Sequence, residues 1–199
     1  MNFPIYKVLI DSDELGIDKI SLVEYPAVEV NFLAFSKDKK QVLLSVDDEQ
    51  RILTGVVARA DYPIYRNDNG YEYYITFDKD VIKEMAIKLL TDNHQNEINI
   101  EHKANSDVDG VQMLEMFIKD SDKGINPKGF EDISDGSLFV TYKVFNDEVW
   151  RSVKEGKFKG FSLEGMFSLE QESEEDKAVE EIMNMLDELE QIINNNKSK

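Results

Sequence analysis

The chain of 199 residues carries a formal net charge of −18, has an apolar fraction of 41% and contains no cysteine. The lack of cysteine excludes disulfides, thiolate catalysis and cysteine-based zinc sites, and is typical of a reducing compartment. The acidic charge argues against nucleic acid as the main partner, because phosphate contacts need basic patches. No run of eighteen apolar residues is present, so no membrane span is expected.

Short strands dominate the pattern of the first fifty residues. Residues 3–10 and 17–27 have strand patterns, and Pro26 stops the second of them. Residues 28–35 predict a further strand. Residues 37–50 mix charges and serines around a short apolar run, which predicts a linker.

The middle of the chain combines strands with one helix. Residues 51–59 predict a core strand, and the turn sequence at 67–70 favours a hairpin or tight loop that leads into a strand over 71–77. Asp78 is a good N-cap for a helix over residues 79–90, which has a regular apolar stripe.

Three further strands are expected before the second helix. The first covers residues 98–102 and ends at His102, and the others cover 111–118 and 138–144. Between the last two, residues 120–136 are rich in Asp, Gly, Lys and Ser. This composition predicts a long surface loop, a kind of segment that is often functional or mobile.

A short helix leads into a glycine-rich strand that contains Ser162. Asn146 or Asp147 can cap this helix. In the strand, Ser162 lies between Gly160 and Gly165. Glycine inside a strand removes side-chain cover and allows another backbone to approach, so we expect Ser162 to be accessible to a peptide.

These elements predict a mostly β fold of the α+β class, arranged as a barrel of about seven strands with helices packed outside. We divide the chain into a barrel domain over residues 1–169 and an acidic helical tail over 170–199. The strands within residues 1–36 complete the barrel, and residues 37–50 connect them to the rest.

An apolar seam predicts a helix in the acidic tail that ends near Asn194. The seam covers about two heptads, which are marginal as a free helix, so we expect the helix either to fold back on the domain or to bind a partner or a second copy. The seam residues are Val179, Ile182, Leu186, Leu189 and Ile193.

Ser162 is the candidate nucleophile and His102 its candidate general base. A serine hydroxyl is a weak nucleophile unless a histidine within hydrogen-bond reach takes its proton. The chain has only two histidines, and the other, His94, lies in a polar turn. Strand alternation places His102 on the face of Ile98 and Ile100, but Ser162 on a polar face. A bulge or strong twist would be needed to bring the two together. No cofactor motif or convincing metal site is present.

Residues 51–169 resemble the prohead (capsid maturation) proteases of tailed phages, in particular the XkdF-like phage serine proteases, which are relatives of the herpesvirus assemblin fold. The family pattern has a histidine at the end of a strand, followed by a polar loop and an apolar strand, as around His102. It continues with a strand, a helix and a nucleophile strand in which serine follows a glycine, as at Gly160 and Ser162.

One departure from the family pattern concerns the N-terminal string Ile-Ser-Leu-Val-Glu-Tyr-Pro-Ala at residues 20–27. Commoner prohead proteases have a similar motif after the serine strand, so the resemblance implies a circularly permuted barrel. The family's acidic third catalytic residue aligns with Lys19, which cannot accept a hydrogen bond. Asp18 is our choice for this role, with Glu24, Asp109 or a simple Ser–His dyad as alternatives.

The resemblance implies a prohead maturation serine endopeptidase that cleaves segments of scaffold and major capsid proteins, and often itself. It would act without a cofactor or metal, inside the assembling procapsid in the host cytoplasm, and neither nucleic acid nor membrane is an expected partner. Assemblin relatives suggest a homodimer by analogy. The alternative is a non-enzymatic capsid assembly or scaffold protein that retains the fold, which Lys19 at the acidic position supports.

Overall fold

The computed structural model describes residues 3–12, 14–28, 33–35 and 50–171, together with Ile182 and Met185 in the tail. Within these residues the chain forms eleven strands and two helices. The elements are β1 (Ile5–Leu9), β2 (Gly16–Val23), β3 (Leu33–Phe35), β4 (Ile52–Ala58), β5 (Ile64–Asp68), β6 (Tyr71–Thr76), α1 (Lys79–Thr91), β7 (Ile98–Ile100), β8 (Val111–Ile118), β9 (Leu138–Val144), α2 (Asp147–Lys154), β10 (Gly160–Met166) and β11 (Ser168–Gln171).

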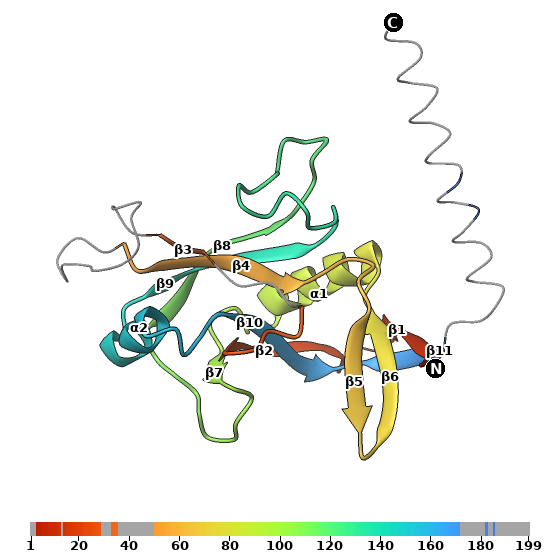
Figure 1. Cartoon of the computed structure of the whole chain (residues 1–199), viewed down its shortest axis with the longest axis horizontal. Helices are drawn as coiled ribbons and strands as arrows, with labels where there is room; N and C mark the ends of the chain where they lie inside the picture. Colours follow the sequence, from red (N-terminus) through yellow and green to blue (C-terminus); the bar gives the residue numbers. More distant parts are fainter. Residues whose placement is uncertain are drawn as a thin grey trace, which may run out of the picture.

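The described strands are hydrogen-bonded as three sheets, with the orders β11-β1-β6-β5, β10-β2-β7 and β3-β4-β9-β8. Sheet β3-β4-β9-β8 lies over sheet β10-β2-β7, α2 lies at one end, and the β5–β6 hairpin projects at the other (Figure 1). The predicted mostly β, α+β class is confirmed. The predicted barrel is not, because the pairing of the described strands does not close: at Phe167 the chain leaves the sheet of β10 and enters that of β11.

Helix α1 and the β5–β6 hairpin are both present, and the residues that predict them make the expected local contacts. The side chain of Asp78 accepts a hydrogen bond from the backbone N–H of Val81 at 2.8 Å and so caps α1. Asn69 and Gly70 have φ values of 51° and 91°, as a tight turn between β5 and β6 requires. The Asn67 side chain accepts from the N–H of Gly70 and closes this turn.

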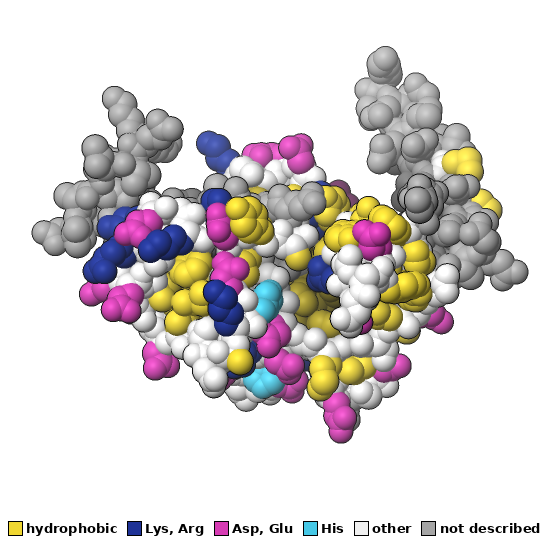
Figure 2. Space-filling view, turned by 60° about the horizontal axis from the view of Figure 1, so that its bottom comes forward, with side chains coloured by type: hydrophobic (Ala, Val, Ile, Leu, Met, Phe, Trp, Pro, Cys, Tyr) yellow, Lys and Arg dark blue, Asp and Glu magenta, His cyan; other side chains and the backbone are white. Residues whose placement is uncertain are grey.

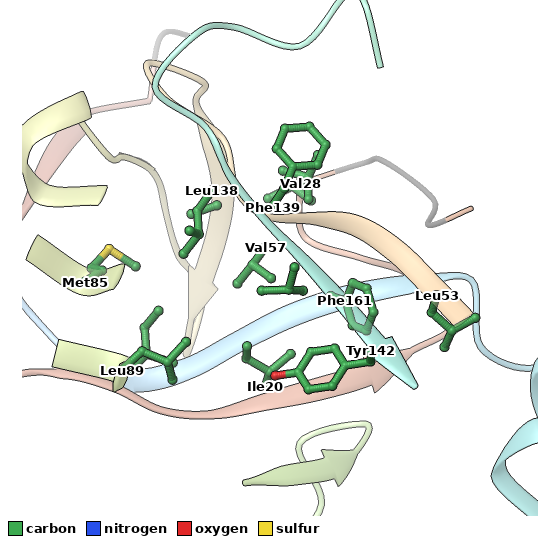
Figure 3. Packing of buried hydrophobic residues seen from close by; sticks show 14 of the residues in the cluster. Ile20, Val28, Leu53, Val57, Met85, Leu89, Leu138, Phe139, Tyr142 and Phe161 are labelled. Atoms are coloured by element: carbon green, nitrogen blue, oxygen red, sulfur yellow. The ribbon is translucent and has the colours of Figure 1, made fainter. Parts of the chain in front are cut away.

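The main core lies between the two facing sheets and against α1 (Figure 3). The ring of Tyr142 on β9 lies 5.5 Å from that of Phe161 on β10, centroid to centroid. Both side chains are almost fully buried. Since Phe161 precedes Ser162, this packing fixes the backbone of the serine strand. Other core residues drawn in Figure 3 are Ile20, Leu53, Val57, Met85, Leu89 and Leu138.

Most of residues 120–136 are exposed, as expected of a surface loop, but two of its side chains pack into the core. Phe130 and Ile133 are buried, and the Phe130 ring packs edge-on against Phe139. Lys119 is 3% exposed, and its ammonium group donates to the carbonyl oxygens of Phe130, Glu131 and Ile133. A buried polar group must have such partners, so this lysine, which directly precedes the loop, holds the loop carbonyls together.

Replacing Lys119 with methionine is expected to lower the free energy of unfolding by about 3 kcal/mol, because the loop carbonyls lose their shared donor. Lys128→Met is the matched control, since Lys128 is exposed in the same loop and its loss should cost less than about 0.5 kcal/mol. Urea denaturation of both variants measures the difference. Equal costs would show that the ammonium group does not hold the loop.

Several predictions fall outside the described residues. These are the linker at 37–49, part of the strand predicted over 28–35, and the tail helix apart from Ile182 and Met185, which are helical and more than half exposed. β11 extends to Gln171, two residues past the predicted domain boundary, and the domain division stays a prediction. Among the described residues, no helix has the length and hydropathy that crossing a membrane requires.

Candidate active site

A row of polar residues crosses the β10-β2-β7 sheet. Ser162 on β10 lies opposite Ser21 on β2, and Ser21 lies opposite Asn99 on β7. Residues in register on adjacent strands point to the same face of a sheet, so these three side chains are neighbours. They are 7%, 0% and 3% exposed respectively. The sequence therefore builds a buried polar row on the face opposite the core residue Phe161.

His102 reaches this row because the chain turns sharply after β7. The strand ends at Ile100, and Glu101 and His102 have φ values of 56° and 53°. Positive φ is uncommon for residues other than glycine, and such strained conformations cluster at functional sites. The prediction that His102 shares a face with Ile98 and Ile100 is wrong, since strand alternation stops two residues earlier. His102 Nδ1 instead lies 2.8 Å from Ser21 Oγ.

Contacts with β2 hold the segment that carries His102. The N–H of Glu101 donates to the carbonyl of Leu22 at 3.1 Å, and the Glu101 side chain accepts from the N–H of Glu24 at 2.7 Å. Lys19 forms an ion pair with Asp107 at 2.5 Å, which raises the pKa of Lys19. Lys19 therefore contacts the loop that follows His102.

A carboxylate lies beside His102, and it belongs to Glu164. Its Oε2 is 3.3 Å from His102 Nδ1 and 2.7 Å from Asn99 Nδ2. The hydrogen bond from Asn99, with a smaller contribution from His102, holds the pKa of Glu164 below its ordinary value. The stabilisation from this carboxylate is therefore present above its ordinary pKa and is lost as the pH falls through the lowered value.

None of the carboxylates predicted as the third catalytic member contacts His102 among the described residues. Asp18 is exposed and lies at the register shift between β2 and β10, Glu24 pairs with Lys159, and Asp109 contributes its backbone carbonyl to Asn146. Glu164 could have been found, because it is two residues from Ser162 and so lies on the same strand face.

Ser162 itself has no hydrogen bond to His102 in the described part of the chain. Its neighbour across the strands, Ser21, makes that contact instead. Ser162 and His102 both have Ser21 as a neighbour and so belong to one polar cluster. Catalytic hydrogen bonds are often long before substrate binds, so the lack of a direct bond does not exclude the pair. The face of the molecule in Figure 2 shows histidine side chains beside acidic ones. No group of three metal-ligating side chains occurs among the described residues.

A serine, a histidine and a carboxylate gathered on one face of a β-rich fold are the components of a serine protease site. A model of the family described as "Putative phage serine protease XkdF" matches residues 39–171. This match covers more than half of the chain, which therefore belongs to this family of phage serine proteases. No curated protein and no solved structure matches the chain.

Proposed function

We propose that this phage serine protease is a prohead maturation endopeptidase in which Ser162 is the nucleophile and His102 the general base. The observation that carries the proposal is the polar row that places Ser162 next to the Ser21–His102 contact. Ser162 Oγ would attack the scissile carbonyl carbon while His102 takes its proton. His102 would return that proton to the leaving amine, and water would then hydrolyse the acyl-enzyme.

Glu164 takes the place of the third catalytic member in this proposal. Its negative charge lies 3.3 Å from His102 Nδ1, where it stabilises the imidazolium that forms during the reaction. The predicted role of Asp18 as third member has no support in the described contacts. With Glu164, the acid and the nucleophile come from the same strand, two residues apart.

Ser162 suits the nucleophile's role better than Ser21 does. Ser21 is fully buried, and its only hydroxyl hydrogen is directed to Asn99 Oδ1. A nucleophile needs to reach a carbonyl carbon and needs its proton free for the base. Ser162 is slightly exposed and follows Gly160 and Phe161, as the nucleophile does in the family pattern.

The proposed substrates are segments of the scaffold and major capsid proteins, and the chain's own tail, inside the assembling procapsid in the host cytoplasm. Family membership supports this setting. β2 lies between β10 and β7, where a strand moved by circular permutation from behind the serine strand would lie. This placement supports the proposed permutation and relation to assemblin, and a homodimer is proposed on that analogy alone.

Cleavage of the candidate substrates tests the proposal. The full-length protein, concentrated, is incubated with the scaffold and major capsid proteins of the same phage, and mass spectrometry follows the fragments. We expect discrete cleavage of the scaffold and trimming of residues beyond Gln171, both lost in Ser162→Ala. If the wild type and Ser162→Ala both assemble with these proteins and neither cleaves them, the protein is a non-enzymatic assembly factor. The missing Ser162–His102 hydrogen bond favours that second candidate.

A further inference from the structure

We infer that Ser21 and Asn99 are positioning residues that hold His102 in the tautomer with its proton on Nδ1 and its lone pair on Nε2. This inference rests on the proposed function for its catalytic consequence, but the tautomer itself can be observed without any substrate. It follows from the direction that each hydrogen bond in the cluster must take.

The donor and acceptor of each hydrogen bond in the cluster can be assigned starting from Glu164. An ionised carboxylate only accepts hydrogen bonds, so the group of Asn99 that faces it must be the NH₂ group. The contact is 2.7 Å from Asn99 Nδ2 to Glu164 Oε2. This requirement also fixes the orientation of the Asn99 amide, which otherwise could be turned by half a rotation. Asn99 Oδ1 must therefore face the other way, toward Ser21.

The orientation of the Asn99 amide then determines which atoms donate in the hydrogen bonds of Ser21 and His102. Asn99 Oδ1 is an acceptor, so Ser21 must donate its one hydroxyl hydrogen to it. Toward His102, 2.8 Å away, Ser21 Oγ has only lone pairs left to offer. His102 Nδ1 must then be the donor in this contact. Glu164 Oε2, the second neighbour of Nδ1, is also only an acceptor and requires the same proton position.

The burial of Ser21 and Asn99 raises the energetic cost of placing the His102 proton on Nε2 instead of Nδ1. Ser21 is 0% exposed and Asn99 is 3% exposed, so bulk water does not offer either side chain a replacement partner. If the proton were on Nε2, the lone pairs of His102 Nδ1 and Ser21 Oγ would face each other, and a buried polar group would lose its hydrogen bond. The N–H of Glu101 donates to the carbonyl of Leu22 and the Glu101 side chain accepts from the N–H of Glu24, so the residue next to His102 is held in place.

The test is ¹⁵N NMR of the full-length protein labelled at histidine, at a pH where the imidazole is neutral. The chain has two histidines, and a His94→Gln variant assigns the signals of His102. We expect the His102 proton on Nδ1 and an unprotonated Nε2. A neutral His102 with its proton on Nε2 would overturn the inference, even in an enzyme that cleaves its substrates. The expected tautomer in a protein that cleaves nothing would leave the inference standing and refute the proposed function.

Variants of the two positioning residues provide the second measurement. In Asn99→Leu, the Ser21 hydroxyl is free to donate to His102 Nδ1, so we expect a mixture of tautomers. We also expect kcat for an active peptide substrate to fall about 10- to 100-fold with little change in KM; a complete switch to the wrong tautomer costs about 10⁴-fold in a well-studied triad. Ser21→Ala, which removes one oxygen atom, is the milder variant if Asn99→Leu folds poorly.

Asn126→Leu is the matched control for Asn99→Leu, because Asn126 is exposed in the 120–136 loop. It should leave both the tautomer and kcat unchanged. If folded Asn99→Leu and Ser21→Ala both keep the proton on Nδ1 and retain full kcat, Glu164 alone sets the tautomer and the role assigned to Ser21 and Asn99 is wrong.

Discussion

Ser162→Ala is expected to lower kcat for peptide hydrolysis by at least about 10³-fold, because it removes the atom that attacks the scissile bond. Ser168→Ala is the matched control. Its hydroxyl lies one strand further along the chain and bonds to Asp11 at 3.0 Å, away from the His102 cluster. Hydrolysis of a peptide taken from a scaffold cleavage site, with melting temperatures for each variant, measures the difference.

His102→Ala should lower kcat to a similar level, and the double variant Ser162→Ala with His102→Ala should be little worse than either single one. Residues that act as one catalytic unit show this lack of additivity. Multiplied losses would mean that the two side chains contribute separately. Retained activity in Ser162→Ala would exclude it as the nucleophile.

Gly165→Ala is expected to lower the free energy of unfolding by about 3 kcal/mol or more, because an added Cβ has no room. That Cβ would lie 1.9 Å from the carbonyl oxygen of Gly16, in the backbone of the neighbouring strand. β10 and β2 would have to separate at the register shift between Glu164 and Gly165. The same movement would displace Glu164 from His102, so activity should fall as well.

Gly124→Ala is the control for this effect. Gly124 has a φ of +76° and no atom within 4 Å of an added Cβ, so its replacement tests backbone strain without a clash. It should cost only about 1 kcal/mol. Guanidinium denaturation compares the two variants. A Gly165→Ala variant that is as stable as Gly124→Ala would show that the two strands separate at little cost.

Elements with strong local patterns could be predicted from the sequence. The strands predicted over 111–118 and 138–144 match β8 and β9, and the helix predicted over 79–90 matches α1 within one residue. The helix has an apolar stripe and the N-cap Asp78, and the two strands are short, mainly apolar runs. These signals lie within the element itself, so the element can be predicted without knowing which other elements it packs against.

The arrangement of the strands and the details of the site depend on contacts between distant segments. No local sequence pattern indicates that β1 pairs with β11 and β6. Because of this pairing, the described strands form three sheets instead of the expected barrel. The positive φ values of Glu101 and His102 follow from tertiary contacts and carry no glycine or proline signal. The spacing from Ser162 to Glu164 is visible in the sequence, but the contacts of Glu164 with Asn99 and His102 depend on β7 lying beside β2.

The most direct test of the central claim is mass spectrometry of the concentrated full-length protein after reaction with a fluorophosphonate probe, which labels activated serines. We predict one adduct on Ser162, present in Ser21→Ala and absent in His102→Ala. An adduct on Ser21, or none on a folded protein in the presence of scaffold and capsid proteins, would contradict the assignment of Ser162 and His102 as nucleophile and base.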